Sequence, residues 1–236
     1  MSRELDASAG GAPVSVIIPV LNAADRIGPC LGALGEAVMD GIIREVILVD
    51  GGSDDAIAEV ADGVGALLIN APRGRGMQLA AGAQAAQGAW LMFLHADSVL
   101  GSDWADAVRR HMHGAPGKAG YFQLAFSSAH PMARLTAGWA NFRARIFGLP
   151  YGDQGLLIPR ALYETSGGFA ELPLMEDVAL VRRLRGRLCA IDMQIETSAE
   201  RYERDGWLRR GSGNLWRLVR YLAGVPAERL AKGYDR

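Results

Sequence analysis

Residues 45–55 read EVILVDGGSDD, an apolar run that ends in an aspartate, two glycines and further polar residues. The run EVILV is short and rich in β-branched residues, which is typical of a strand buried on both faces. The two glycines predict a tight loop, because glycine lets the backbone turn sharply and approach a ligand closely. Residues 56–64 then have helical character. The stretch therefore predicts a strand–loop–helix unit of a parallel α/β sheet.

Similar units precede and follow this stretch. The other expected strands are 15–20, 66–69 and 90–94, and the other expected helices are 22–39 and 76–87. Strands that alternate with helices predict a mostly parallel central sheet flanked by helices on both faces. Ligands of such sheets bind beyond the carboxyl ends of the strands, so residues 14–98 are expected to form a Rossmann-like nucleotide-binding half.

The second half of the sequence is less regular. Strands are expected at 121–126, 155–158 and 190–195, and helices at 104–113, 133–147, 178–188 and 208–222. Scattered strands favour a mixed sheet that closes over the first half. We expect a disordered stretch at 1–13 and a single domain at 14–236, with an acceptor half at 99–200 and a basic helical tail at 201–236.

Composition excludes several classes of protein. The 236 residues are 50% apolar and carry a formal net charge of −1, which disfavours a net-basic nucleic-acid binder. Two cysteines, Cys30 and Cys189, cannot build a disulfide framework and favour a reducing compartment. The N-terminal residues lack the apolar core of a signal peptide, and no apolar run has the length of a membrane span. These features predict a cytoplasmic protein.

The C-terminal tail differs in charge from the rest of the chain. Residues 201–236 hold nine basic and four acidic residues, a net charge of +5, which leaves −6 for residues 1–200. In the expected helix, Leu215, Leu218, Val219 and Leu222 share one face. A basic amphipathic helix either rests on a membrane surface or packs on its own domain. Peripheral membrane contact is therefore one of two expectations.

Polar residues follow the expected strands. Asp50 can accept hydrogen bonds from a base or ribose, and Asp54 is positioned to cap the next helix. His95 and Asp97 project to the same side after the fourth strand, because side chains alternate along a strand. Together they can hold a divalent cation and leave positions for diphosphate oxygens, although Asp97 can also simply cap a turn.

Two further clusters suit anion binding and proton transfer. Arg73 and Arg75 flank a glycine at a helix start, which suits a diphosphate but also fits a solvated basic turn. Glu176 and Asp177 open a helix, where acidic residues serve either as a general base or only as favourable charges at the helix N-terminus. The chain has neither a P-loop nor a GxGxxG motif, which disfavours a nicotinamide site.

Five stretches, in order, resemble family 2 glycosyltransferases of the GT-A fold. They are Val14–Asn22 (VSVIIPVLN), Glu45–Asp54 (EVILVDGGSD), Trp90–Asp97 (WLMFLHAD), Gly167–Phe169 (GGF) and Met175–Leu184 (MEDVALVRRL). The longer strings RGRGMQLAAGA at 73–83 and LPLMEDVALVRRL at 172–184 resemble a small soluble bacterial subfamily. That subfamily is often named as arsenosugar-biosynthesis glycosyltransferases.

The resemblance implies an inverting, metal-assisted transfer of a sugar from a nucleotide-diphosphate sugar to an acceptor hydroxyl, with uridine diphosphate as the default nucleotide. It implies that Asp50 contacts the base and that Asp177, beside Glu176, is the general base. It also implies that Asp97 is the last aspartate of the DxD metal motif, in which His95 replaces the first. The expected cofactor is therefore Mn²⁺ or Mg²⁺, and an imidazole ligand favours manganese.

The remaining assignments concern substrate contacts. Donor-binding candidates are Pro19, Asn22, Asp50, Gly51, Arg73, Arg75 and Ala96. Acceptor-binding candidates are Asp153, Gln154, Arg201 and Arg204. Two alternatives remain: a nucleotidyltransferase, which would need a glycine-rich first loop that VIIPVLNAADR lacks, and a non-catalytic nucleotide-binding or membrane-surface protein, which His95 in place of an acid leaves open.

Overall fold

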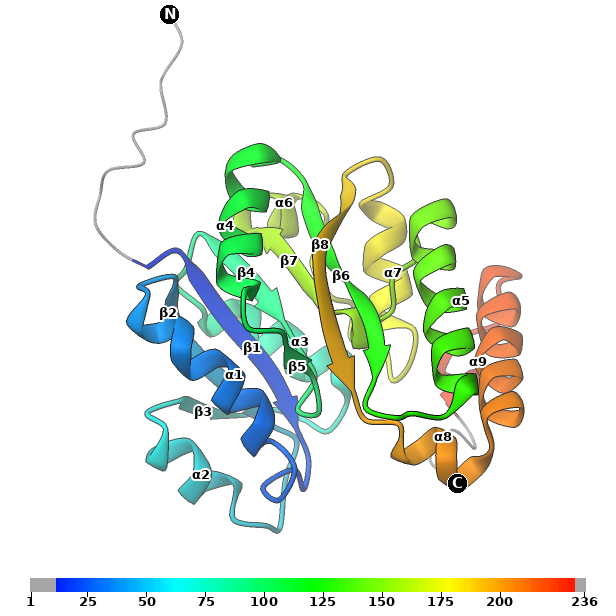
Figure 1. Cartoon of the computed structure of the whole chain (residues 1–236), viewed down its shortest axis with the longest axis horizontal. Helices are drawn as coiled ribbons and strands as arrows, with labels where there is room; N and C mark the ends of the chain where they lie inside the picture. Colours follow the sequence, from blue (N-terminus) through cyan, green and yellow to red (C-terminus); the bar gives the residue numbers. More distant parts are fainter. Residues whose placement is uncertain (1–11, 232–236) are drawn as a thin grey trace, which may run out of the picture.

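The computed structural model describes residues 12–231, which contain an eight-stranded sheet with helices on both faces (Figure 1). The strands are β1 (Val14–Val20), β2 (Ile43–Asp50), β3 (Leu67–Asn70), β4 (Trp90–Phe93), β5 (Val99–Leu100), β6 (Ala119–Phe126), β7 (Leu156–Pro159) and β8 (Leu188–Thr197). Their order is β3-β2-β1-β4-β7-β6-β8-β5. The disorder expected at 1–13 concerns mainly residues 1–11, which lie outside the described residues, as do residues 232–236 of the tail.

The first half is the predicted parallel sheet. β1 pairs in parallel with β2 and β4, and β2 pairs in parallel with β3. Its helices are α1 (Gly28–Met39), α2 (Ile57–Gly63) and α3 (Arg75–Ala85). Along β1, Val16 and Ile18 enter the core that contains Leu34 of α1, whereas Ile17 enters the core that contains Leu79 of α3. Both faces of the strand are buried, which explains its continuous apolar sequence.

Two local predictions in this half are wrong. The helix expected at 22–39 begins only at Gly28, because Asn22 has a left-handed φ of 48° and Pro29 occupies the first turn, where a proline costs no hydrogen bond. Asp54 does not cap the next helix. That helix begins at Ile57 without a side-chain cap, and the Asp54 N–H donates instead to Asn22 Oδ1 at 2.8 Å.

The second half is mixed, as predicted. β7 is antiparallel to β4 and β6, β8 is parallel to β6, and β5 is antiparallel to β8. Its helices are α4 (Trp104–Gly114), α5 (Pro131–Phe147), α6 (Arg160–Thr165), α7 (Glu176–Arg183), α8 (Glu200–Asp205), α9 (Trp207–Leu222) and α10 (Ala227–Ala231), with a 3₁₀ turn at Gly152–Gln154. The helix expected at 178–188 therefore begins earlier and ends five residues sooner. β5, α6 and α8 were not predicted.

Helices α5 and α9 lie side by side at one end of the molecule (Figure 1). Leu218 of α9 is buried in a small core with Leu174, Met175 and Val178 beside α7. This residue therefore does not share an exposed face with Leu215, as the sequence suggested, because it anchors α9 to the domain. Among residues 12–231, no helix is both long enough and apolar enough to span a membrane.

Candidate active site

The loops after β1 and β2 are joined by side-chain hydrogen bonds. Asp50 ends β2, is 7% exposed, and accepts hydrogen bonds from the backbone N–H and the hydroxyl of Ser53 at 3.0 and 2.5 Å. The Asn22 N–H donates to Ser53 Oγ at 2.9 Å. The polar residues predicted from two separate strand ends therefore meet, and each fixes the position of the other's loop.

Gln78 of α3 is a residue that the sequence analysis did not single out. Its side-chain amide donates to the carbonyls of Val20 and Val49 at 2.9 and 2.7 Å, at the ends of β1 and β2. A Cβ at Gly51 would lie 3.1 Å from Gln78 Nε2, so this glycine permits the close approach. The available signal was a glutamine among the small residues of the helix that follows Arg75.

A cleft of about 870 Å³ runs along these strand ends, a volume in the range of small-molecule sites. Eight predicted residues line it: Pro19, Arg73, Arg75, His95, Ala96, Asp97, Glu176 and Arg201. Gln78 also lines it, whereas Asn22, Asp50 and Gly51 do not. The cleft therefore brings together the basic loop before α3 and the polar end of β4.

A smaller cavity of about 130 Å³ adjoins the cleft. Arg75, His95, Asp97, Glu176 and Arg201 line both spaces, so the two are contiguous. Asp153 and Asp177 line only the smaller one. The arrangement offers a larger compartment lined by Arg73 and Arg75 and a smaller one beside it lined by Asp153 and Asp177.

Asp177 is held by two backbone donors. Its Oδ2 accepts from the Gly152 N–H at 2.7 Å, and its Oδ1 accepts from the Val178 N–H, also at 2.7 Å. The carboxylate is thereby fixed in orientation at the start of α7, on the wall of the smaller cavity. A carboxylate in a defined position beside an open space has the geometry that a general base needs.

Glu176 is buried beside Asp177, with Arg75 Nε 3.9 Å from its Oε1. Burial and the neighbouring Asp177 raise the pKa of Glu176 well above its ordinary value, while Arg75 acts in the opposite direction. Glu176 therefore keeps its proton more readily than an ordinary glutamate. Asp177 is the less buried of the two carboxyls.

His95 has a buried Nε2 without a hydrogen-bond partner among the described residues. Burial, followed by the charges of Arg75 and Arg201, holds its pKa well below its ordinary value. A Cβ at Gly152 would lie 2.7 Å from this nitrogen, so the glycine leaves room for the ring. A neutral imidazole with an unused nitrogen is a competent metal ligand.

The residues fit a metal held largely by its substrate. No group of three or more His, Cys, Asp or Glu side chains within 12–231 is arranged to hold a cation. Asp97 and His95 nevertheless line the same cleft. Mg²⁺ and similar ions are commonly bound through one or two protein ligands plus substrate phosphates. These two side chains can therefore hold a divalent ion together with a diphosphate.

The four predicted acceptor residues separate into two groups. Asp153 and Arg201 line the smaller cavity, and burial raises the pKa of Asp153 to about 6 against the opposing charge of Arg143. Gln154 is fully buried, where its amide donates to the carbonyl of Phe122 at 3.2 Å. Arg204 lies outside both cavities. The structure thus places Gln154 and Arg204 away from the ligand space.

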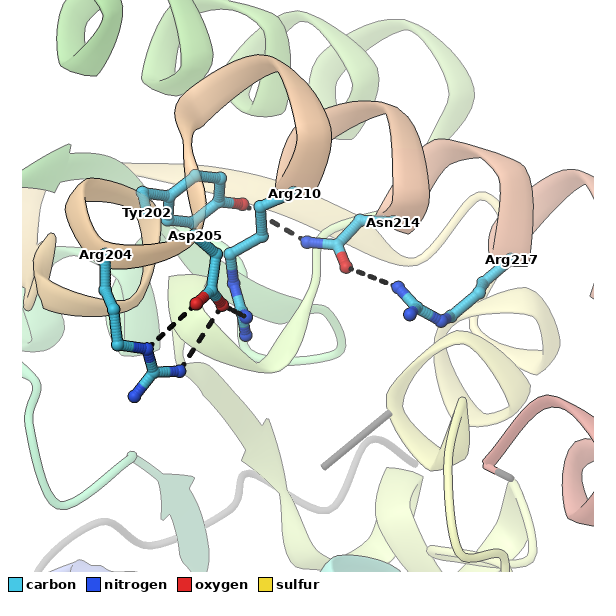
Figure 2. A network of polar contacts seen from close by, with 6 residues as sticks. All are labelled: Tyr202, Arg204, Asp205, Arg210, Asn214 and Arg217. Atoms are coloured by element: carbon cyan, nitrogen blue, oxygen red, sulfur yellow. Dashed lines mark hydrogen bonds and ion pairs between the residues drawn. The ribbon is translucent and has the colours of Figure 1, made fainter. Parts of the chain in front are cut away.

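Helices α8 and α9 form the far wall of the smaller cavity. Figure 2 shows its polar contacts: Arg204 and Arg210 both bind Asp205, Asn214 donates to the Tyr202 hydroxyl at 3.2 Å, and Arg217 donates to Asn214 Oδ1 at 3.3 Å. Tyr202, Arg210, Asn214 and Arg217 line the cavity. Side chains that contact one another therefore form part of this wall.

The first half of the chain is similar to a known protein family. Residues 15–119 match the model of the family described as Glycosyl transferase family 2. No curated protein sequence matches the chain. The match covers less than half of the 236 residues, and glycosyltransferase is the enzyme class that it supports.

Solved structures share the fold at low sequence identity. TarS 1-349 of S. aureus, in complex with UDP-GlcNAc, has a TM-score of 0.61 at 14% identity, covering 79% of this chain and 58% of that chain. Glucosyl-3-phosphoglycerate synthase from Mycobacterium tuberculosis, in complex with Mn²⁺, UDP and glucosyl-3-phosphoglycerate, has a TM-score of 0.56 at 21% identity, covering 78% and 71%. Its complex with Mg²⁺ and UDP has a TM-score of 0.59 at 19% identity, covering 78% and 70%. The predicted GT-A fold is confirmed, although the chain spans only about three fifths of the TarS structure.

Proposed function

We propose that this chain, whose residues 15–119 match Glycosyl transferase family 2, transfers a sugar from a nucleotide-diphosphate sugar to an acceptor hydroxyl with inversion at the anomeric carbon. The single observation that carries the proposal is the position of Asp177. Two backbone donors fix its carboxylate in a cavity that opens into the cleft lined by Arg73 and Arg75. An acceptor in the smaller cavity and a donor in the cleft would meet beside it.

In the proposed reaction, the acceptor oxygen forms a bond to the anomeric carbon while the bond from that carbon to the diphosphate breaks. Asp177 takes the proton of the attacking hydroxyl. A positioned general base typically contributes about 10²–10⁴-fold to the rate. Attack from the side opposite the leaving group inverts the anomeric configuration, which is why the base and the diphosphate site belong on opposite sides of the sugar.

Negative charge grows on the departing diphosphate, and fixed cations lower the free energy of that state. Arg73 and Arg75 line the cleft and are the groups that would face the diphosphate. A divalent ion on Asp97 and His95 would supply further positive charge there when bound. Manganese is our proposed ion, because imidazole suits later transition metals better than it suits magnesium.

Uridine diphosphate is the proposed nucleotide, supported by the complexes of two structural neighbours with UDP-GlcNAc and with UDP. Asp50 remains our proposed base contact, although in the structure its carboxylate is engaged by Ser53. The likeness to the arsenosugar-named subfamily and a cytoplasmic location stay predictions.

A ligand screen tests the proposal. Thermal unfolding of the full chain is followed with UDP, GDP, ADP and CDP, each with and without MnCl₂, and then with UDP-sugars. We expect UDP with manganese to raise the unfolding free energy by about 3 kcal/mol at 100-fold excess over Kd. The protein should also hydrolyse a UDP-sugar slowly, with water as the acceptor, and so release UDP. Absence of any nucleotide effect, together with absence of UDP release from every donor tried, would contradict the proposal.

A further inference from the structure

Helix α5 shows the reverse of the usual distribution of side chains. It packs on β6, and its buried positions are the small residues Ala133, Ala137, Ala140 and Ala144, together with Arg143. Its large apolar residues are exposed: Leu135, Trp139, Phe142, Ile146 and Phe147. Trp139 and Phe142 stack on each other with ring centroids 5.9 Å apart. The helix therefore presents an aromatic and aliphatic stripe away from the core.

Helix α9 also exposes large apolar side chains. Leu208, Leu215, Trp216, Val219 and Leu222 are exposed on it, and the helix lies beside α5 (Figure 1). Ten of the thirteen large apolar residues that are exposed within 12–231 thus belong to these two helices. We call these ten residues the α5–α9 face. Large exposed apolar patches on soluble domains mark contact sites, because isolated monomers rarely maintain them.

The charge of the two helices is one-sided. Residues 131–147 and 207–222 contain seven arginines and no aspartate or glutamate. Arg134, Arg145 and Arg209 are exposed among the apolar residues. An apolar face whose own two helices carry arginines and no acidic residue complements an anionic, partly apolar surface.

We propose that the α5–α9 face docks onto the surface of a membrane that contains anionic lipids. Trp, Phe and Leu side chains would enter the boundary between headgroups and acyl chains, while the arginines remain with the lipid phosphates. A second copy of the chain fits less well, because a two-fold contact through the same face would bring arginines of like charge together in both subunits. The tail predicted from sequence is therefore one half of the proposed surface, and α5 is the other half.

Vesicle flotation tests the docking with the full chain. Vesicles of phosphatidylcholine alone are compared with vesicles that also contain phosphatidylglycerol, at low and high salt. We expect the protein to float with the anionic vesicles at low salt and to be released by salt, because each basic residue near such a surface adds about fivefold to binding. Protein that stays entirely with the unbound fraction overturns the proposal.

Matched variants locate the contact. Trp139→Ser with Trp216→Ser should reduce the vesicle-bound ratio by at least about tenfold, because two interfacial aromatics are lost. Val64→Ser with Leu67→Ser is the control, since both residues are exposed apolar side chains outside the face. All four positions are exposed, so unfolding temperatures should change little. Equal reductions of vesicle binding by the two double variants would overturn the assignment of the contact to the α5–α9 face.

Arginine variants test the contribution of charge to vesicle binding, and sedimentation tests self-association. Arg134→Gln with Arg145→Gln should weaken binding to anionic vesicles by about 20-fold, whereas Arg110→Gln on α4, also exposed, should not. Sedimentation velocity without lipid should give a monomer. A dimer that the paired tryptophan variant abolishes, without vesicle binding by the wild type, would assign the face to a second copy and overturn the membrane proposal.

Discussion

The backbone N–H of Gly152 donates to Oδ2 of Asp177 over 2.7 Å, across a separation of 25 residues. This bond ties the 3₁₀ turn before β7 to the first turn of α7. The same glycine leaves room for His95, whose Nε2 would be 2.7 Å from a Cβ at position 152. The backbone at Gly152 therefore helps to position both the proposed base, Asp177, and the imidazole of His95.

Replacing Asp177 with asparagine should impair chemistry more than donor binding. The amide keeps the size and polarity of the side chain but cannot take a proton. We expect kcat for transfer, or for donor hydrolysis, to fall about 10²-fold or more while nucleotide affinity stays nearly unchanged. Steady-state kinetics and calorimetry measure the two quantities. Retained turnover in Asp177→Asn alongside an inactive Glu176→Gln would move the base to Glu176.

Asp97→Asn should remove the contribution of the divalent ion to nucleotide binding. An amide is a weaker ligand than a carboxylate for a hard cation. Calorimetric titration of UDP into the wild type should give tighter binding with Mn²⁺ than with a chelator, and the variant should give the same weaker affinity in both. An unchanged dependence on manganese in Asp97→Asn would contradict the metal assignment.

Asp153 should make stability depend on pH. Burial raises its pKa in the folded state from 3.8 to about 6, so folding favours its protonated form. The associated stability is complete below pH 4 and is lost as pH rises through about 6. Asp153→Asn remains neutral, so its unfolding free energy relative to wild type should increase by up to about 3 kcal/mol between these limits. Denaturant titrations at pH 4 and 7 measure this, and a constant difference contradicts it.

Gln78→Leu should destabilise the fold at the ends of β1 and β2. The change leaves the carbonyls of Val20 and Val49 without their side-chain donor in a buried setting. The Val20 carbonyl still accepts from the Gly51 N–H at 3.0 Å. Two side-chain hydrogen bonds are lost at about 0.5–1.5 kcal/mol each, so we expect a loss of about 1–3 kcal/mol. Gln84→Leu, at an exposed position of the same helix, is the control and should change stability little. Similar losses in both variants would refute the role of the amide.

Gly76→Ala should be far more damaging than an ordinary glycine substitution in a helix. A Cβ there would collide with the Ala170 carbonyl and lie 2.9 Å from that of Leu172, and neither backbone group can rotate away. We expect a loss of several kcal/mol, on the scale of overpacked core sites. Gly35→Ala in α1, with open space around it, should instead gain about 0.5–1 kcal/mol. Thermal unfolding of both variants decides between these outcomes.

The parallel half of the fold is predictable because its signal is local. Each buried strand is a continuous apolar run, and each loop after it is polar, so EVILVDGGSDD alone indicates strand, loop and ligand edge. The start of α1 is less predictable. Its apolar spacing extends into residues that the structure holds in turns, where Asn22 is fixed by its hydrogen bonds to the loop after β2.

The second half resists prediction because its elements are short. β5 has two residues and α8 has six, too few to show a period of either kind. The contacts of Gln78 and Gly152 depend on segments that meet only in the folded chain. Sequence reasoning therefore finds the residue types of the candidate site, whereas the partners that orient them come from tertiary structure.

Helix α3 packs against both sides of the proposed reaction centre: against β1 and β2 on one side and against the loop before α7 on the other. Gly82 in its middle lies against β1 and β2, where a Cβ would be 2.8 Å from Val49 Cγ2, and Gly76 at its start touches the loop before α7. This close packing leaves no room for Arg75 to move relative to Glu176 and Asp177. The wall made by α8 and α9 faces the cavity with pairs of side chains, Arg210 with Asp205 and Asn214 with Tyr202. Evolution or engineering of a new acceptor preference is therefore expected to proceed through that wall, while the α3 side tolerates little change.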